Sequence, residues 1–477
     1  MQTSLAPEYR DTADGREAEA ILRACVHCGF CTATCPTYQI LGDELDGPRG
    51  RIYLIKEVLE GKPPTQATQL HLDRCLTCRN CETTCPSGVQ YGHLVDIGRR
   101  IVDAQVPRGA ASRAVRWALK EGIPSPAFVP AMKAGQAVRG LLPQALRSKV
   151  PPRERPPVLS PAVVRRAPLG RHARRVLLLA NCVQPAMAPA IDQATLRVLD
   201  AAGIEGTYAP RSGCCGAVKF HLNDQEGGLA LMRRNVDAWH PLLASGEAEA
   251  LVMNVSGCGV TVREYGHHLR HDPAYAERAA AVSAATRDLS ELLPELLPHL
   301  AARLGTLPED AAPRARLVFH PPCTLQHGQR LRGGVETHLR TLGFDVRLPA
   351  AESHLCCGSA GTYSTLHPEI ATQLRDRKLG HIAGAFAAAP PHADSDGDGS
   401  NDAGFGGYGG GDEDDADRAT TTPAAAMPDA IVSANVGCIA HLQSGTGVPV
   451  RHWVEVVDEA LALADAAPTA AMAAAVR

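Results

Sequence analysis

The spacing of apolar residues divides this chain into a helical N-terminal part and a longer part in which strands and helices alternate. Between residues 49 and 60, apolar side chains stand at Ile52, Ile55, Val58 and Leu59, a helical spacing. Gly61 and the prolines that follow it end this predicted helix. The same reasoning predicts further helices over residues 1–23, 68–74 and 93–106.

From residue 175 onward, short apolar runs of strand length alternate with helical patterns, and the arrangement occurs twice. Each unit opens with a buried-strand pattern that ends in Cys, continues through a helix and a second strand to a Cys-Cys-Gly triplet, and closes with a strand running into another Cys. The predicted strands lie within residues 175–182, 201–210 and 251–258 of the first unit, and 316–323, 341–349 and 431–438 of the second. This alternation predicts parallel sheets with the Cys residues at the carboxyl ends of the strands.

We therefore expect an α+β multidomain protein with an N-terminal α-helical ferredoxin module and two α/β Cys-Cys-Gly repeat domains. The predicted domains are a helical module (1–106), a basic Pro/Arg-rich linker (107–172), a first Cys-Cys-Gly domain (173–312) and a second one (313–477). The second domain has 38 more residues between its doublet and its last Cys, which matches an acidic Gly-rich segment over 389–426 that we expect to be disordered. Residues 404–409 match G-x-G-x-x-G, but neither a strand nor a helix flanks them, so we assign no nucleotide or flavin site there.

Composition and charge narrow the class of protein further. The net charge of −3 gives no indication of a nucleic acid partner. No signal peptide is visible, so the 16 Cys residues belong in a reducing compartment and are better explained as metal ligands than as disulfides. No apolar run reaches the length of a membrane span, so we expect a cytoplasmic protein, soluble or peripheral to the membrane.

Residues 108–175 contain 15 Lys/Arg and two Glu. This basic segment has two interpretations: it is a docking surface for an anionic membrane or a partner subunit, or it is a solvated connector.

The Cys residues of the N-terminal module carry the strongest chemical signal. Two runs, 25–36 and 75–86, each read C-x2-C-x2-C-x3-C-P, the spacing of bacterial two-cluster ferredoxins, in which the fourth Cys of each run ligates the other cluster. We expect Cys25, Cys28, Cys31 and Cys85 to hold one [4Fe–4S] cluster, and Cys35, Cys75, Cys78 and Cys81 to hold the second. Zinc fits this spacing less well, because its structural sites usually use paired C-x2-C groups.

Other residues of the module leave two interpretations open. His27, inside the first Cys loop, is either a surface residue or a ligand or proton carrier. Arg49 and Arg51 either place positive charge near a cluster or lie at a solvated helix N-terminus.

The two Cys-Cys-Gly triplets, at 214–216 and 356–358, predict a metal or redox role in at least one repeat, with core packing as the alternative. A turn at the Gly is needed to aim adjacent Cys side chains at one point. The second repeat adds His320, His327, His354 and His441, where the first has Thr261 in place of His441. We therefore place a possible further centre at Cys323, Cys356, Cys357 and Cys438.

The phrases around these Cys residues resemble one family in particular, the iron–sulfur subunits of bacterial glycolate oxidase (glycolate dehydrogenase). The resemblance covers nearly the whole chain and rests on residues 24–38, 42–51, 75–86, 323–327 and 354–363. It implies an electron-transfer subunit with no catalytic residues of its own. Partner flavoprotein subunits would oxidise glycolate to glyoxylate, and electrons would pass on towards a quinone or another acceptor at the membrane.

Other functions remain open at this stage. The Cys-Cys-Gly domains also resemble those of heterodisulfide reductase, where a further C-x2-C pair helps to hold an unusual cluster; here Thr261 and His441 replace the last Cys of that pair. A thiol/disulfide enzyme subunit is therefore an alternative, as is a zinc-stabilised scaffold. Within the electron-transfer class, lactate and glycerol-3-phosphate dehydrogenase complexes are the other candidates.

Overall fold

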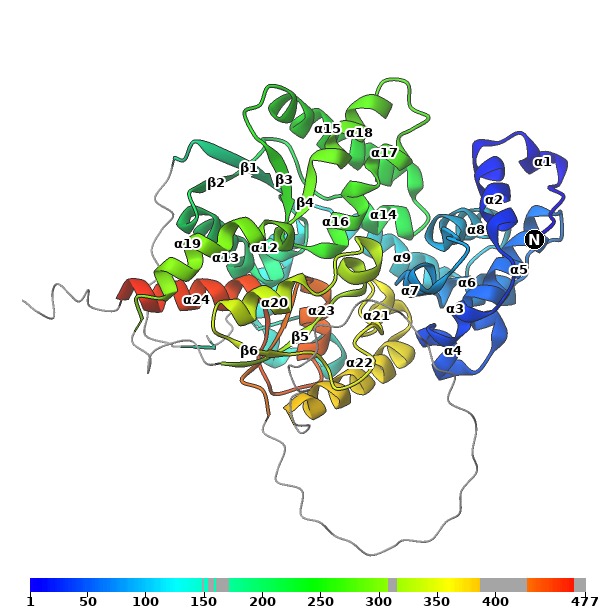
Figure 1. The fold of residues 1–477 in the computed structure, drawn as a ribbon. Coiled ribbons are helices and arrows are strands. Elements are labelled where there is room, and N and C mark those ends of the chain that lie inside the picture. Colours follow the sequence, from blue (N-terminus) through cyan, green and yellow to red (C-terminus); the bar gives the residue numbers. More distant parts are fainter. Residues whose placement is uncertain (148–149, 153–157, 160–170, 308–314, 387–426, 467–477) are drawn as a thin grey trace, which may run out of the picture.

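A computed structural model describes residues 1–147, 150–152, 158–159, 171–307, 315–386 and 427–466 (Figure 1). The acidic segment predicted over 389–426, together with its G-x-G-x-x-G match, lies outside the described residues, as does much of 148–170. Within the described parts the chain forms helices and two parallel sheets, so the predicted α+β multidomain class is confirmed.

Residues 1–106 form a helical module without strands, at one end of the molecule (Figure 1, blue). Its elements are α1 (Pro7–Arg10), α2 (Ala13–Ala24), α3 (Phe30–Ala33), α4 (Pro36–Leu41), η1 (Glu44–Asp46), α5 (Pro48–Leu59), α6 (Gln66–Asp73), α7 (Asn80–Thr84) and α8 (Tyr91–Gln105). Helix α5 starts with a proline, which suits the first helical position, and its predicted apolar face is buried against α8. Hydroxyl caps at Thr12 and Thr65 begin α2 and α6.

The segment expected to be a linker contains α9 (Ala110–Gly122), α10 (Phe128–Ala137), η2 (Arg139–Leu141) and α11 (Gln144–Arg147). Helix α9 is attached to its neighbours by ion pairs: Arg116 lies 3.0 Å from Asp73, and Lys120 lies 3.5 Å from Asp224. Neither α9 nor α10 contains a buried residue, and Trp117 is 63% exposed. The described part of this segment is therefore a helical layer on the surface.

The first repeat (residues 173–312) contains a four-stranded parallel sheet in the order β2-β1-β3-β4. Its elements are β1 (Arg174–Leu178), α12 (Gln184–Met187), α13 (Pro189–Ala201), β2 (Ile204–Tyr208), α14 (Ala217–His221), α15 (Gln225–Ala244), β3 (Ala250–Met253), α16 (Ser256–Arg263), α17 (Tyr265–His268), α18 (Ala276–Ala285), β4 (Thr286–Asp288), η3 (Leu289–Leu292) and α19 (Leu293–Leu304).

The second repeat (residues 313–477) repeats this topology, with the parallel order β6-β5-β7-β8. Its elements are β5 (Arg316–His320), the π-helix η4 (Thr324–Gly328), α20 (Gly334–Thr341), β6 (Asp345–Arg347), α21 (Tyr363–Leu366), α22 (Pro368–Ala383), η5 (Gly384–Phe386), β7 (Ala430–Ser433), α23 (Val436–Gln443), β8 (Val450–His452) and α24 (Trp453–Ala466). All six predicted strands are present; β4 and β8 were not predicted.

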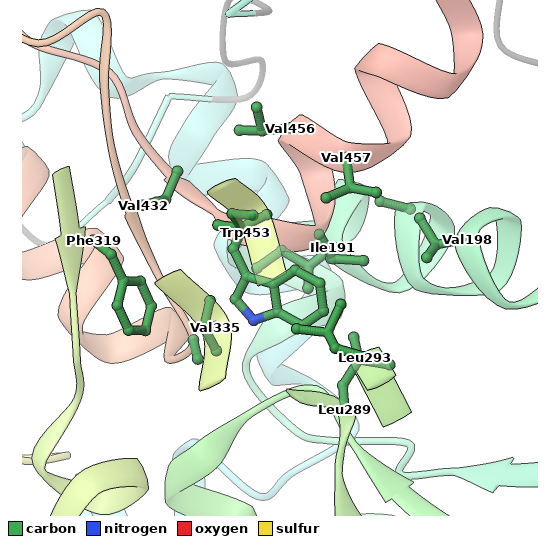
Figure 2. Packing of buried hydrophobic residues seen from close by; sticks show 14 of the residues in the cluster. Ile191, Val198, Leu289, Leu293, Phe319, Val335, Val432, Trp453, Val456 and Val457 are labelled. Carbon is green, nitrogen blue, oxygen red and sulfur yellow. The ribbon is translucent and has the colours of Figure 1, made fainter. Parts of the chain in front are cut away.

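One hydrophobic core joins the two repeats. Trp453, at the start of α24, is completely buried between apolar side chains of both repeats, including Leu293 on one side and Val335 on the other (Figure 2). Helix α24 also packs against α13 and α19 of the first repeat. The repeats therefore form one body around α24, and this body fixes the position of the Cys residues in each.

The ferredoxin module (residues 1–106) contacts both repeats. Arg79 pairs with Glu264 of the first repeat, and the Thr83 hydroxyl lies 2.7 Å from His327 Nδ1 of the second. Tyr363 of the second repeat donates to the Arg74 carbonyl at 3.0 Å. Each of these contacts involves the second Cys run of the module or its immediate flank, so this run lies at the contact with the repeats.

None of the helices in the described part of the chain combines the length and the apolar character that crossing a membrane requires.

Candidate iron–sulfur sites

The first Cys set surrounds a cavity that is open to solvent. Cys25, Cys28, Cys31 and Cys85 all line it. The loop turns at Gly29, whose φ of 89° is the left-handed conformation that glycine adopts readily, and α3 then begins at Phe30. Cys25 is buried whereas Cys28 is exposed, so this cavity opens to the surface on the Cys28 side.

The second Cys set surrounds a neighbouring cavity. It is lined by Cys35, Cys75, Cys78 and Cys81, together with Arg51, Leu76 and Tyr91. The fourth Cys of each run thus lines the cavity of the other run, and Cys81 borders both cavities. Cys35 reaches this cavity because Pro36 begins α4 immediately after it.

The thiols within each set influence one another electrostatically. Burial, followed by the charges of Cys25, Cys85 and Cys28, raises the pKa of Cys31 to about 11. Burial also raises the pKa of Cys81, and the main charges of other Cys residues acting on it are those of Cys78, Cys75 and Cys35. Burial and mutual repulsion keep these crowded thiols protonated when no metal is bound. A bound metal offsets the negative charge of the thiolates, so the same four thiols then become favourable ligands. Both cavities therefore fit an iron–sulfur cluster.

The two arginines of α5 differ in their surroundings. Arg51 is 1% exposed, and it donates to the His71 carbonyl at 2.7 Å and to the Thr37 hydroxyl at 3.2 Å. Arg49 is more exposed; it pairs with Glu44 at 2.6 Å and lines the first cavity. Each arginine thus places positive charge beside one of the two cavities. His27 is exposed and lies 3.4 Å from the Arg49 carbonyl oxygen.

The predicted Cys set of the second repeat also comes together. Cys323, Cys356, Cys357 and Cys438 are all buried, and the Cys323 and Cys356 sulfurs are 3.9 Å apart. Cys357 contacts the thiols of both Cys356 and Cys438. These residues follow β5, β6 and β7 at the carboxyl edge of the sheet.

The turn that aims the doublet depends on Gly358. Its φ is 87°, and a Cβ atom there would lie 2.5 Å from the carbonyl oxygen of Ala371, closer than any side chain can approach. Gly216 has the same role in the first repeat, with φ of 92° and a Cβ position 2.7 Å from the Gly228 carbonyl oxygen.

The matching Cys set of the first repeat converges in the same way. The Cys214 thiol interacts with those of Cys182 and Cys215, and the Cys215 thiol with that of Cys258. The interactions with Cys182 and Cys215 lower the pKa of Cys214 to about 3. Sequence reasoning favoured the second repeat because of its histidines, but the structure gathers four thiols in both.

Thiols of the second repeat lie beside the second ferredoxin cavity, whose lining residue Arg79 also pairs with Glu264 of the first repeat. Leu76, Cys323, Cys356 and Tyr363 share a buried cluster, and Cys78 packs on it. After burial, the charge of Cys323 is the largest influence that raises the pKa of Cys78. The thiols of the second repeat therefore lie next to the second ferredoxin cavity, which in turn adjoins the first.

The histidines of the second repeat have different surroundings. His327 is held by Thr83 and by the His354 carbonyl, 2.8 Å from its Nε2, and His441 Nε2 lies 3.0 Å from the Ala371 carbonyl. Burial lowers the pKa of His327 to about 4. His320 is the one whose ring lies within 4.8 Å of the Cys357 and Cys438 sulfurs.

Sequence reasoning missed Lys378 on α22. Its side chain is 2% exposed, and its ammonium donates to the Glu352 carbonyl. Burial lowers the pKa of Lys378 to about 8 despite the opposing charges of Cys357, Cys356 and Cys323. A lysine in a helical pattern with polar neighbours gives no sign that it is buried beside thiols.

Comparisons with known proteins agree with this arrangement. Residues 21–89 match the model of the 4Fe-4S dicluster domain, and residues 176–263 and 317–389 match that of the Cysteine-rich domain. The chain is 47% identical over 468 residues to the glycolate oxidase iron-sulfur subunit of Escherichia coli (strain K12), covering 97% of this chain and 99% of the relative. It is 30% identical over 412 residues to the probable glycolate oxidase iron-sulfur subunit of Bacillus subtilis (strain 168), covering 79% and 86%. Lactate utilization protein A of Exiguobacterium sp. is 26% identical over 212 residues, which is 43% of this chain and 80% of the relative.

Proposed function

Since the chain belongs to the family of glycolate oxidase iron–sulfur subunits, we propose that it carries electrons from a partner flavoprotein, which oxidises glycolate to glyoxylate, towards a quinone or another acceptor. In this proposal the subunit has no catalytic residues for the substrate. Its role is to hold one-electron centres between a two-electron donor and the acceptor, at the inner face of the cytoplasmic membrane.

The observation that carries the proposal is the pair of adjacent four-Cys cavities. We assign one [4Fe–4S] cluster to Cys25, Cys28, Cys31 and Cys85, and the other to Cys35, Cys75, Cys78 and Cys81. Such clusters supply one-electron oxidation and reduction when bound. The chain contributes the eight thiolates, the positive charges of Arg49 and Arg51, and a mostly apolar lining around both cavities.

The surface around Cys28 supports a docking position for the flavoprotein. Val26 and Phe30 flank the exposed Cys28 and are 68% and 56% exposed, and Tyr53, 44% exposed, lies next to His27. Exposed apolar side chains around a redox centre suit a protein partner. The second cavity faces the repeats instead. We therefore assign the first cluster, on the exposed Cys28 side, as the one that receives electrons from the flavoprotein.

A third centre would extend the series of redox centres beyond the second cavity; its ligands would include Cys323, Cys356, Cys357 and Cys438. Its support is the contact of Cys78 and Leu76 with the cluster that contains Cys323 and Cys356. A thiol/disulfide enzyme would need these thiols to be accessible to its substrate, whereas Cys356 and Cys357 are 3% and 1% exposed in the structure. The burial favours a relay.

The extent of the comparisons favours glycolate over lactate as the electron source. The two glycolate oxidase relatives align over 97% and 79% of this chain. The lactate utilization protein A relatives align over less than half of it, as the Exiguobacterium protein does with 43%. The glycolate relatives therefore share both the ferredoxin module and the repeats with this chain.

Purification of the native complex under anaerobic conditions tests the proposal. Glycolate added to the complex should reduce flavin first and then produce the EPR signals of two [4Fe–4S] clusters, in an amount that accounts for the eight Cys ligands. L-lactate and glycerol 3-phosphate serve as comparison substrates. Absence of a flavoprotein from the purified complex, or reduction of the clusters by lactate and not by glycolate, would contradict the proposal.

A further inference from the structure

His320 is a buried imidazole without a hydrogen-bond partner. It is the last residue of β5 and 1% exposed, and neither Nδ1 nor Nε2 is bonded to any described residue. Its backbone is held in place, because the Ser433 hydroxyl donates to its carbonyl oxygen at 2.9 Å. Burying polar ring atoms without a partner costs free energy, so an unbonded imidazole in a well-packed interior indicates a missing partner.

The ring nitrogens of His320 lie near thiols. One of them and the sulfurs of Cys357 and Cys438 all lie within 4.8 Å of one another. Among the described residues, the ammonium of Lys378 is the only charged group that influences the imidazole. A neighbouring cation disfavours the protonated imidazole and cannot form an ion pair with it. No charge among the described residues therefore offsets the cost of burying this histidine.

The first repeat shows that the fold does not require a polar residue at this position. In the register of the two sheets Leu178 corresponds to Phe319, so Leu179 corresponds to His320. Leu179 is 2% exposed and packs in a core cluster that includes Cys215. The two repeats thus have the same four Cys positions. The histidine distinguishes the second repeat, whose Cys323 and Cys356 share a buried cluster with Leu76 of the second ferredoxin cavity.

We propose that His320 is a ligand of an iron–sulfur centre in the second repeat, together with Cys357 and Cys438 and completed by Cys323 and Cys356. This inference rests on the third centre proposed above and adds a nitrogen ligand to it. Thiolates with one imidazole form a donor set that iron and zinc both accept. The contact with the second ferredoxin cavity favours a redox-active metal, and therefore iron.

The test compares H320L with H299L in the purified complex. H320L introduces the residue that the first repeat has at this position, and His299 is an exposed histidine of α19, which makes it the matched control. Pulsed EPR should detect an imidazole ¹⁴N coupling to a paramagnetic iron centre in the wild-type protein and in H299L. H320L should lose this coupling. H320C, which restores a soft ligand, should keep the iron of the third centre without the ¹⁴N coupling.

Metal analysis separates this inference from the relay function. Wild-type chains should contain more iron than the roughly eight atoms of two [4Fe–4S] clusters. Two cluster signals with no third iron centre, zinc in place of iron, or a ¹⁴N coupling that persists in H320L would each overturn the inference and leave the two-cluster relay intact. Absence of the two ferredoxin cluster signals would instead refute the relay itself.

Discussion

Arg79 and Glu264 form a two-pronged ion pair, with distances of 2.5 Å between Nη1 and Oε1 and 2.7 Å between Nη2 and Oε2. Arg79 lies between Cys78 and Cys81 in the second Cys loop, and Glu264 follows α16 of the first repeat. Their side chains are 12% and 20% exposed, and His93 Nε2 lies 3.3 Å from the same carboxylate. This contact therefore helps to fix the second Cys loop on the repeats.

Replacing Glu264 with Gln is expected to weaken the attachment of the ferredoxin module. The charge that pairs with Arg79 is removed while the guanidinium stays largely buried, which should cost about 2 kcal/mol of folding free energy. Thermal unfolding of the anaerobic protein should show a lower Tm. Glu277→Gln, which changes an exposed carboxylate on α18, should leave the Tm unchanged; equal effects of the two substitutions would contradict this role.

The same contact should make stability depend on pH. Burial opposes ionisation of Glu264, but hydrogen bonds from His93 and Arg79 outweigh it and lower the pKa of Glu264. Burial disfavours the charged form of His93, yet the bond to Glu264 raises its pKa above the usual value. The Glu264 contribution is therefore complete above the unfolded pKa of about 4.3, and it is lost as the pH falls through the lowered pKa.

The His93 contribution has the opposite sign: it is complete below the unfolded pKa of about 6.5, and it is lost as the pH rises through the raised pKa. The Tm should consequently decline as the pH rises from about 6.5 through the raised pKa of His93. His93→Gln should flatten this part of the curve, whereas His299→Gln, an exposed control, should not. An unchanged slope in His93→Gln would show that another group titrates there.

The sequence predicted those parts of the site that depend on short-range spacing. The two C-x2-C-x2-C-x3-C-P runs fold locally into loops, and the structure brings each fourth Cys to the opposite cavity. Apolar runs mark β1, β3, β5 and β7, whereas β2 and β6 were placed by their position before the Cys-Cys-Gly triplets. Strands β4 and β8 were missed because each has only three residues, includes a charged one such as Arg287 or Arg451, and, unlike the equally short β6, leads to no Cys.

The contacts between distant segments could not be predicted in this way. Arg79 and Glu264 are 185 residues apart, and neither stands in a pattern that names its partner. The burial of His320 depends on β7 and α23, which lie more than one hundred residues further along the chain. The one indication in the sequence that His320 is buried is the internal repeat, because it aligns His320 with the apolar Leu179.

Arg51 is expected to raise the reduction potential of the second cluster. Positive charge stabilises the reduced and more negative form, and Arg51 lines the second cavity. Arg51→Met removes the charge, while Arg74 stays 2.8 Å from the buried Asp46 that Arg51 also contacts. Potentiometric EPR titration should show a potential lowered by on the order of tens of millivolts for one cluster.

Arg49→Met is the matched comparison, because Arg49 lines the first cavity. It should lower the potential of the other cluster, and by less, since Arg49 is more exposed. Arg51→Lys should restore much of the wild-type value. A shift of the same cluster by both Met substitutions would contradict the assignment of one arginine to each cavity.

Cys31→Ser should interrupt the path of electrons without affecting substrate oxidation. Cys31 lines the first cavity with Cys25, Cys28 and Cys85, and a serine hydroxyl is a much poorer ligand for iron than a thiolate. In the purified complex about four irons per chain should be lost, as one [4Fe–4S] cluster contains. Reduction of a quinone analogue by glycolate should fall strongly, while single-turnover reduction of flavin by glycolate should persist.

Thr34→Ser controls for disturbance of the same loop, because it keeps the hydroxyl that donates to the Cys31 carbonyl at 3.4 Å. This variant should retain its iron and its quinone reductase activity. Since the proposal places substrate oxidation on the partner, the flavin of an intact Cys31→Ser complex has no need of the first cluster in its first turnover. If flavin reduction failed in such a complex, the first Cys set would take part in the substrate half-reaction, and a pure relay role for this subunit would be wrong.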